Sequence, residues 1–118
     1  MKKSAKKSAA THNKSVLDHA AKTVNMPVGS LIGFIPNKGQ DGNCVVTLEA
    51  GPQHANPMGT LHGGILIDIA DAAMGLAFAS TLSEGESFTT LELKINFFRP
   101  VWQAQLRAAG HVIRVAAR

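Results

Sequence analysis

The segment His62–Ser80 (HGGILIDIADAAMGLAFAS) is long enough for a helix of several turns and carries apolar residues on nearly every side. A helix without a polar face is buried all round, either in the core of a protein or in a membrane. Asp68 and Asp71 lie within this segment, and each carboxylate would cost about 2.5–3.5 kcal/mol at the centre of a bilayer. The segment also begins with glycines and lacks basic residues at its ends. It therefore predicts a central helix wrapped by a sheet, and not a transmembrane span.

Two strands and a short helix are predicted before this central helix. Leu31–Pro36 and Asn43–Ala50 are joined by a turn rich in asparagine, glycine and aspartate, which favours an antiparallel pair. A short helix is expected over Ser15–Asn25, because its serine can cap the first turn. Pro27 and Gly29 are expected to end that helix.

Two further strands are predicted after the central helix. Phe88–Phe98 alternates apolar and polar residues, which is typical of a strand with one buried face, and Arg99-Pro100 closes it. Gln103–Val115 is interpreted as its antiparallel neighbour, with Gly110 as a bulge or a point of close approach. Strands on both sides of one buried helix predict an α+β domain in which a curved antiparallel sheet wraps around a long central helix.

The net charge of +4 comes from the N-terminus. Residues 1–15 carry five lysines and no acidic residue, whereas the rest of the chain has seven basic and eight acidic residues. Residues 1–15 are therefore interpreted as a disordered basic tail, and residues 16–118 as the folded domain. A solubilising role is favoured for the tail, so neither nucleic acid nor a membrane is expected as a partner.

The cysteine and histidine content points away from disulfides and metals. Cys44 is the only cysteine, which excludes an internal disulfide, and no His or Lys stands close enough in sequence to suggest activation. It is interpreted as a small buried residue, which fits a cytoplasmic protein. His19, His54 and His111 show no metal-ligand spacing, so neither a metal nor a cofactor is expected.

The residues that lead into the central helix suit the chemistry of an acyl carbonyl. The stretch 56–64 (NPMGTLHGG) reaches the helix N-terminus, where backbone N–H groups lack partners and carry a partial positive charge. Gly63 and Gly64 would let a carbonyl approach the backbone, and such donors stabilise an oxyanion. Asp71, inside the helix, suits a general base or a nucleophile. Glycines before a helix also serve packing alone, so the residues by themselves leave both interpretations open.

The stretch from His54 to Pro100 resembles the hotdog-fold acyl-CoA thioesterases, in particular the PaaI-like thioesterases of phenylacetate degradation. The shared pattern is Asn-Pro-x-Gly-x-x-His-Gly-Gly, an acid nine residues after the histidine, and a strand that ends in an Arg-Pro turn. The resemblance implies a hotdog fold and hydrolysis of an acyl-CoA thioester to the free acid and coenzyme A. It also implies acyl-CoA as the substrate partner and a homodimer or homotetramer.

The resemblance assigns a role to each matching residue. The backbone N–H of Gly63 polarises the thioester carbonyl, and Asp71 activates water or attacks directly. Asn56 helps to position the acid or the water. Thr90 assists from the third strand, or Thr89 does so if the register shifts by one. Family members also continue with two further strands, so the last two strands of the hotdog domain are expected to be missing at the C-terminus.

Alternatives remain open for three residues and for the function. Asp68 lies on much the same helix face as Asp71 and is a rival base. His62 is interpreted either as part of the catalytic site or as a residue that only orders the loop, and Asn56 either as catalytic or as a turn former before Pro57. The alternative functions are a hotdog hydratase or dehydratase, which pairs a catalytic histidine with an acid, and a non-catalytic acyl-CoA-binding domain. The sequence does not name the acyl group.

Overall fold

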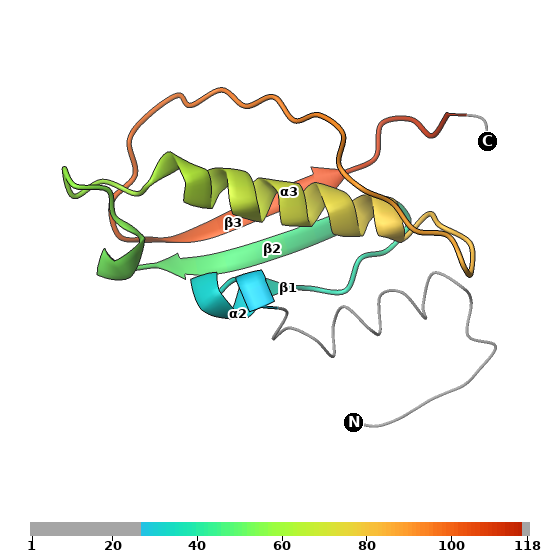
Figure 1. The fold of residues 1–118 in the computed structure, drawn as a ribbon, viewed down its shortest axis with the longest axis horizontal. Helices are drawn as coiled ribbons and strands as arrows, with labels where there is room; N and C mark the ends of the chain where they lie inside the picture. The colour runs from blue at the N-terminus through green and yellow to red at the C-terminus, as the bar shows by residue number, and fades with distance from the viewer. Residues whose placement is uncertain (1–26, 117–118) are drawn as a thin grey trace.

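The computed structural model describes residues 27–116, so the predicted basic tail over residues 1–15 and the predicted helix Ser15–Asn25 lie outside the described residues. The described elements, in chain order, are α2 (Pro27–Ile32), β1 (Ile35–Pro36), β2 (Asn43–Ala50), the 3-10 helix η1 (Pro52–His54), α3 (Gly63–Ala79) and β3 (Ala104–His111). The described strands form one antiparallel sheet in the order β1-β2-β3, and α3 packs across it (Figure 1). This is the α+β arrangement that the sequence predicts.

The segment before β2 differs from the prediction. Pro27 and Gly29 belong to α2, whereas the helix that they are predicted to end lies outside the described residues. Proline is compatible with a first helical turn, because the N–H that it lacks has no partner there. The helix ends at Ile32, and Gly33 follows with a φ of 96° and an N–H that donates to the Gly29 carbonyl at 2.7 Å. The predicted strand Leu31–Pro36 is therefore wrong except for β1.

The centre of the sheet follows the prediction closely. The predicted strand Asn43–Ala50 is confirmed with the same bounds, and it pairs with β3 along its whole length. The predicted strand Gln103–Val115 is confirmed from Ala104 to His111, as β3, but its antiparallel neighbour is β2 and not the predicted 88–98 stretch. Alternate residues of β2 are buried. Two of them, Val46 and Leu48, form the core with Phe34 from the link between α2 and β1 and with Ile69 and Ala73 of α3.

The central helix is confirmed as α3, with His62 as its N-cap and Ser80 as its C-cap. Its buried residues Ile69 and Ala73 pack against the sheet, whereas most of its other residues are half-buried and Met74 is exposed. The prediction of burial on every side is therefore met only on the sheet-facing side. No helix within residues 27–116 combines the length and the hydropathy that crossing a bilayer requires.

Gly110 lets α3 lie close against β3. A Cβ atom added to Gly110 would stand 2.7 Å from the carbonyl carbon and oxygen of Ala73, which is too close for any side chain. Gly110 is thus the point of close approach that the sequence predicts. Cys44 is buried as predicted, and burial raises the pKa of its thiol.

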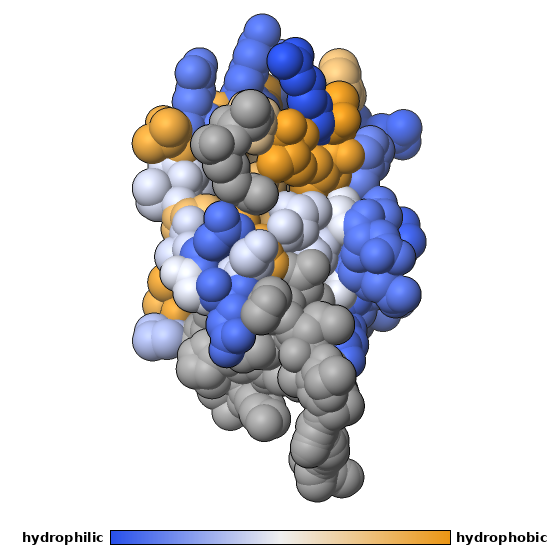
Figure 2. Space-filling view, turned by 90° about the vertical axis from the view of Figure 1, so that its right-hand side faces the viewer, coloured by the Kyte–Doolittle hydropathy of each residue, from blue (hydrophilic) through white to orange (hydrophobic). Residues whose placement is uncertain are grey.

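The stretch 88–98 is extended but does not form the predicted strand. It runs past α3 on the side away from β2 (Figure 1), and within residues 27–116 it pairs with no strand. A strand is held by backbone hydrogen bonds to a neighbour, and among residues 27–116 no such ladder joins this segment to β3. Leu91 is 93% and Phe98 92% exposed. Figure 2 shows hydrophobic groups open to solvent near the top of the molecule, the height at which this segment runs in Figure 1.

Candidate active site at the start of the central helix

The loop between η1 and α3 is shaped by the side chain of Asn56. Its Nδ2 donates to Thr60 Oγ1 at 2.7 Å, and its Oδ1 accepts the N–H groups of Met58 and Thr60 at 2.9 and 3.2 Å. Two backbone bonds add to these: the Asn56 N–H donates to the Thr60 carbonyl, and the Asn56 carbonyl accepts the N–H of Gly59. The amide of Asn56 therefore closes a tight loop directly before the helix.

The first turn of α3 leaves one backbone donor available. His62 caps the helix: its Nδ1 accepts the N–H of Gly64 at 2.9 Å, and its carbonyl accepts the N–H of Ile65 at 3.0 Å. The N–H of Gly63 has no acceptor among residues 27–116. A helix N-terminus adds partial positive charge at this position. The Gly63 N–H is thus a preorganised donor for an oxygen that carries negative charge.

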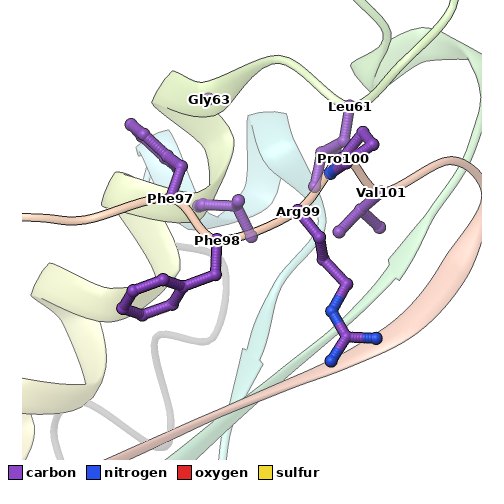
Figure 3. A pocket seen from close by; sticks show the side chains of 8 residues that line it. Leu61, Gly63, Phe97, Phe98, Arg99, Pro100 and Val101 are labelled. Carbon is purple, nitrogen blue, oxygen red and sulfur yellow. The ribbon is translucent and has the colours of Figure 1, made fainter.

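The space beside Gly63 is bounded by the end of the 88–98 stretch and the residues that follow. Figure 3 shows Phe97 lying against the first turn of α3, while the side chain of Arg99 extends away from it. A Cβ atom on Gly63 would come within 3.1 Å of Phe97 Cζ, so a side chain there would crowd the ring slightly. A cavity of about 350 Å³ opens here. Its lining residues are Leu61, Gly63, Leu66, Phe97, Phe98, Arg99, Pro100 and Val101.

A buried histidine lies behind this loop. His54 is 5% exposed, and both of its ring nitrogens are engaged. Its Nδ1 accepts the N–H of Gly51 at 3.0 Å, and its Nε2 lies 2.7 Å from the carbonyl oxygen of Ile32. Its own carbonyl accepts the N–H of His62 at 2.9 Å. Sequence reasoning weighs His54 only as a metal ligand and misses this contact, because Ile32 is 22 residues away in the chain.

The predicted acid lies further along α3. Asp71 is half-buried, and its Oδ1 accepts a hydrogen bond from Thr90 Oγ1 at 2.9 Å. Of the two candidate threonines, Thr90 is the one that reaches the carboxylate. Asp68, the rival base, is also half-buried on α3. Within residues 27–116 there is no group of three or more histidine, cysteine or acidic residues that could hold a metal ion.

The predicted site residues thus form two groups in one protomer. Asn56, His62 and Gly63 gather at the helix start, and Asp71 pairs with Thr90 further along. Gly63 and Asp71 are eight residues apart in α3, which corresponds to about 12 Å along the helix axis at 1.5 Å per residue. The two groups of one chain therefore cannot contact the same reacting carbonyl.

Comparison with known proteins identifies the family. The thioesterase superfamily profile matches residues 58–118. A protein of Saccharolobus solfataricus, whose name assigns it provisionally to the esterases, is 35% identical over 75 residues, or 64% of this chain and 53% of its own. The chain therefore spans about half the length of this relative.

Solved structures share the fold. A conserved protein from Pseudomonas aeruginosa has a TM-score of 0.74 and 32% identity, covering 79% of this chain and 74% of its own. The phenylacetic acid degradation protein PaaI from Thermus thermophilus, solved as a mutant, has a TM-score of 0.71 and 28% identity, covering 79% and 78%. A thioesterase-like protein from Streptococcus pneumoniae, solved with coenzyme A, has a TM-score of 0.62 and 27% identity, covering 70% and 63%. The chain belongs to the thioesterase superfamily and has the hotdog fold of the PaaI-like thioesterases.

Proposed function

We propose that this protein hydrolyses acyl-CoA thioesters to the free acid and coenzyme A. The observation that carries the proposal is the N–H of Gly63 at the start of α3, which has no acceptor among the described residues and lies beside the cavity formed with Phe97. Donors of this kind stabilise the oxyanion that forms when a thioester carbonyl is attacked. The family match and the coenzyme A bound to the Streptococcus pneumoniae relative support the choice of a thioester substrate.

In this proposal the substrate carbonyl oxygen accepts the N–H of Gly63. Asp71 removes a proton from water as the water attacks the carbonyl carbon, or its own carboxylate oxygen attacks that carbon. The tetrahedral intermediate then re-forms the carbonyl and expels the coenzyme A sulfur. After direct attack, a water molecule hydrolyses the mixed anhydride. The Thr90 hydroxyl, 2.9 Å from Asp71 Oδ1, orients the carboxylate.

We assign His62 and Asn56 to the same site as residues that shape it. His62 Nδ1 accepts the N–H of Gly64 and so lacks the free lone pair that a base at this nitrogen would need. The amide of Asn56 is engaged by Thr60 and Met58. Both side chains therefore contribute by fixing the backbone on either side of Gly63.

The site is proposed to lie between two protomers of a homodimer. The separation of about 12 Å between Gly63 and Asp71 along α3 is incompatible with a reaction centre built from one chain. A second chain would supply the missing acid or donor. The stretch 88–98, which carries Thr90, is extended, exposes apolar side chains and pairs with no strand in the described chain, so it suits contact with a partner.

The sharpest test removes the Gly63 N–H and leaves the helix in place. Gly63 is the first residue of α3, where proline is tolerated, and the ψ of 129° at His62 is the value favoured before a proline. Gly63→Pro is expected to lower kcat by about 10²–10³-fold, as for loss of an oxyanion donor. Gly63→Ala is the matched control, because it keeps the N–H and adds only the contact with Phe97.

Activity is measured as thiol released from a panel of acyl-CoA substrates. Gly63→Ala is expected to retain much more activity than Gly63→Pro. Equal losses in the two variants would mean that crowding against Phe97, and not the N–H, is responsible. A hydratase or a binding domain would leave the thioester intact, so the absence of thiol release across the panel would contradict the proposed function.

A further inference from the structure

Two buried polar side chains lie at opposite ends of α3. Within residues 27–116 they are His54, near the start of the helix, and Ser80, at its end. Ser80 Oγ accepts the N–H of Gly42 and donates to the Ala77 carbonyl, both at 2.6 Å, which fixes the helix end to the turn before β2. His54 makes the equivalent connection at the other end, where the proposed oxyanion donor lies.

The contacts of His54 define its tautomer. Because Nδ1 accepts the N–H of Gly51, this nitrogen carries no proton, and Nε2 must donate to the Ile32 carbonyl. Ile32 is the last residue of α2, and the final carbonyls of a helix lack partners within it. The imidazole therefore provides a partner for the Ile32 carbonyl at the end of α2 and for the Gly51 N–H directly after β2.

The backbone of His54 carries this connection to the site. Its carbonyl accepts the N–H of His62 at 2.9 Å, and His62 is the N-cap of α3. The Gly63 N–H belongs to the next peptide, His62–Gly63, so its direction depends on how His62 is held. The ring fixes His54 to two elements of the fold, and the carbonyl fixes the start of the helix to His54.

We propose that His54 is a positioning residue that sets the direction of the Gly63 N–H. This inference rests on the proposed thioesterase function. An oxyanion donor acts most strongly in the transition state, so a small change in its direction lowers kcat and leaves KM nearly unchanged. A residue that only stabilised the fold would not lower kcat while leaving KM nearly unchanged.

The experiment compares His54→Phe with Ser80→Ala. His54→Phe keeps a ring in the buried site and removes both of its hydrogen bonds, whereas Ser80→Ala removes the corresponding bonds at the other end of α3. Both variants are expected to lower Tm. His54→Phe is expected to lower kcat by about 10–100-fold, at most the effect of losing the donor itself, with KM within about twofold. Ser80→Ala is expected to keep kcat near the wild-type value.

Amide hydrogen exchange gives a second readout that does not depend on activity. The N–H of His62 is expected to exchange faster in His54→Phe and at the wild-type rate in Ser80→Ala, relative to amides in the middle of α3. His54→Gln retains a donor for the Ile32 carbonyl and is expected to recover part of kcat and of the protection. It also serves as the test variant if His54→Phe does not fold.

Two results would overturn the inference. The first is a kcat for His54→Phe that matches that of Ser80→Ala when both have lost similar Tm. The second is wild-type exchange at His62 in His54→Phe. If the wild-type protein released no thiol, the proposed function would fail, and the exchange of His62 would still decide whether His54 holds the helix start.

Discussion

The hydroxyl of Thr90 donates a 2.9 Å hydrogen bond to Oδ1 of Asp71 and thereby links the extended 88–98 stretch to α3. A hydroxyl that donates to one carboxylate oxygen fixes the orientation of the carboxylate and leaves the second oxygen for a water molecule or a substrate. In the proposed reaction the second oxygen accepts the proton of water or attacks the carbonyl carbon.

The first prediction distinguishes the two acids of α3. Asp71→Asn keeps the size of the side chain and removes the base or nucleophile, so kcat is expected to fall by about 10²–10⁴-fold. Asp68→Asn is the matched control on the same helix and is expected to retain most of the activity. Thiol release from an acyl-CoA measures both. Normal turnover in Asp71→Asn together with loss of activity in Asp68→Asn would reverse the assignment of the base.

The second prediction concerns the hydroxyl that holds Asp71. Thr90→Val keeps the shape of the side chain and removes its donor. The bond is solvent-exposed, so its loss is expected to cost about 1 kcal/mol, or about fivefold in kcat. Thr89→Val, the same change one residue earlier, is expected to leave kcat unchanged. A larger effect at Thr89 would show that the register of this stretch differs during catalysis.

Local sequence patterns were sufficient to predict the centre of the fold. The predicted strand Asn43–Ala50 has the bounds of β2, and Gly110 marks the point where α3 approaches β3. The stretch 88–98 alternates equally well but does not join the sheet within the described residues. Alternation reports which side of a segment is apolar, whereas a strand also needs a neighbour for its backbone hydrogen bonds.

Apart from Thr90, which the family resemblance supplied, the candidate site was predictable only where its residues are close in sequence. The motif around Gly63 and its spacing to Asp71 place both residues on one helix, as α3 shows. The role of His54 depends on its bond to Ile32, 22 residues away, which no local pattern encodes.

The third prediction follows from the raised pKa of Cys44. Burial is the main cause of the increase, and a hydrogen bond with the Val45 backbone opposes it. The thiol of the unfolded chain ionises at its ordinary pKa, while the folded protein keeps the proton. The resulting contribution to stability is complete below the unfolded pKa and is lost as the pH rises through the folded pKa.

Chemical denaturation at equal protein concentration measures this loss. Between about pH 7 and about pH 10, which spans the thiol range, the free energy of unfolding is expected to fall more for the wild type than for Cys44→Ala. The comparison is needed because other groups titrate equally in both proteins. An equal fall in the free energy of unfolding of the wild type and of Cys44→Ala would show that the thiol ionises as readily in the folded protein as in the unfolded chain.

The last prediction tests whether each site is shared between two chains. In a heterodimer of Gly63→Pro and Asp71→Asn chains, one shared site has both defects and the other has none. Random mixing makes half of the dimers heterodimers, so activity is expected to recover to about a quarter of the wild-type value in a two-fold symmetric dimer. A site within one chain would give no recovery.

A mixture of wild-type chains with chains that carry both substitutions provides the matched control. If sites are shared, every site of the heterodimer has one defect, and only wild-type homodimers remain active, at about a quarter of the activity. If each chain carries a complete site, half of the sites stay intact and about half of the activity remains. Differently tagged chains show that heterodimers have formed. Two results together would contradict a shared site: heterodimers that form without recovery of activity in the first mixture, and half of the activity in the second. Gly63 and Asp71 of one chain would then have to act together despite their separation of about 12 Å along α3.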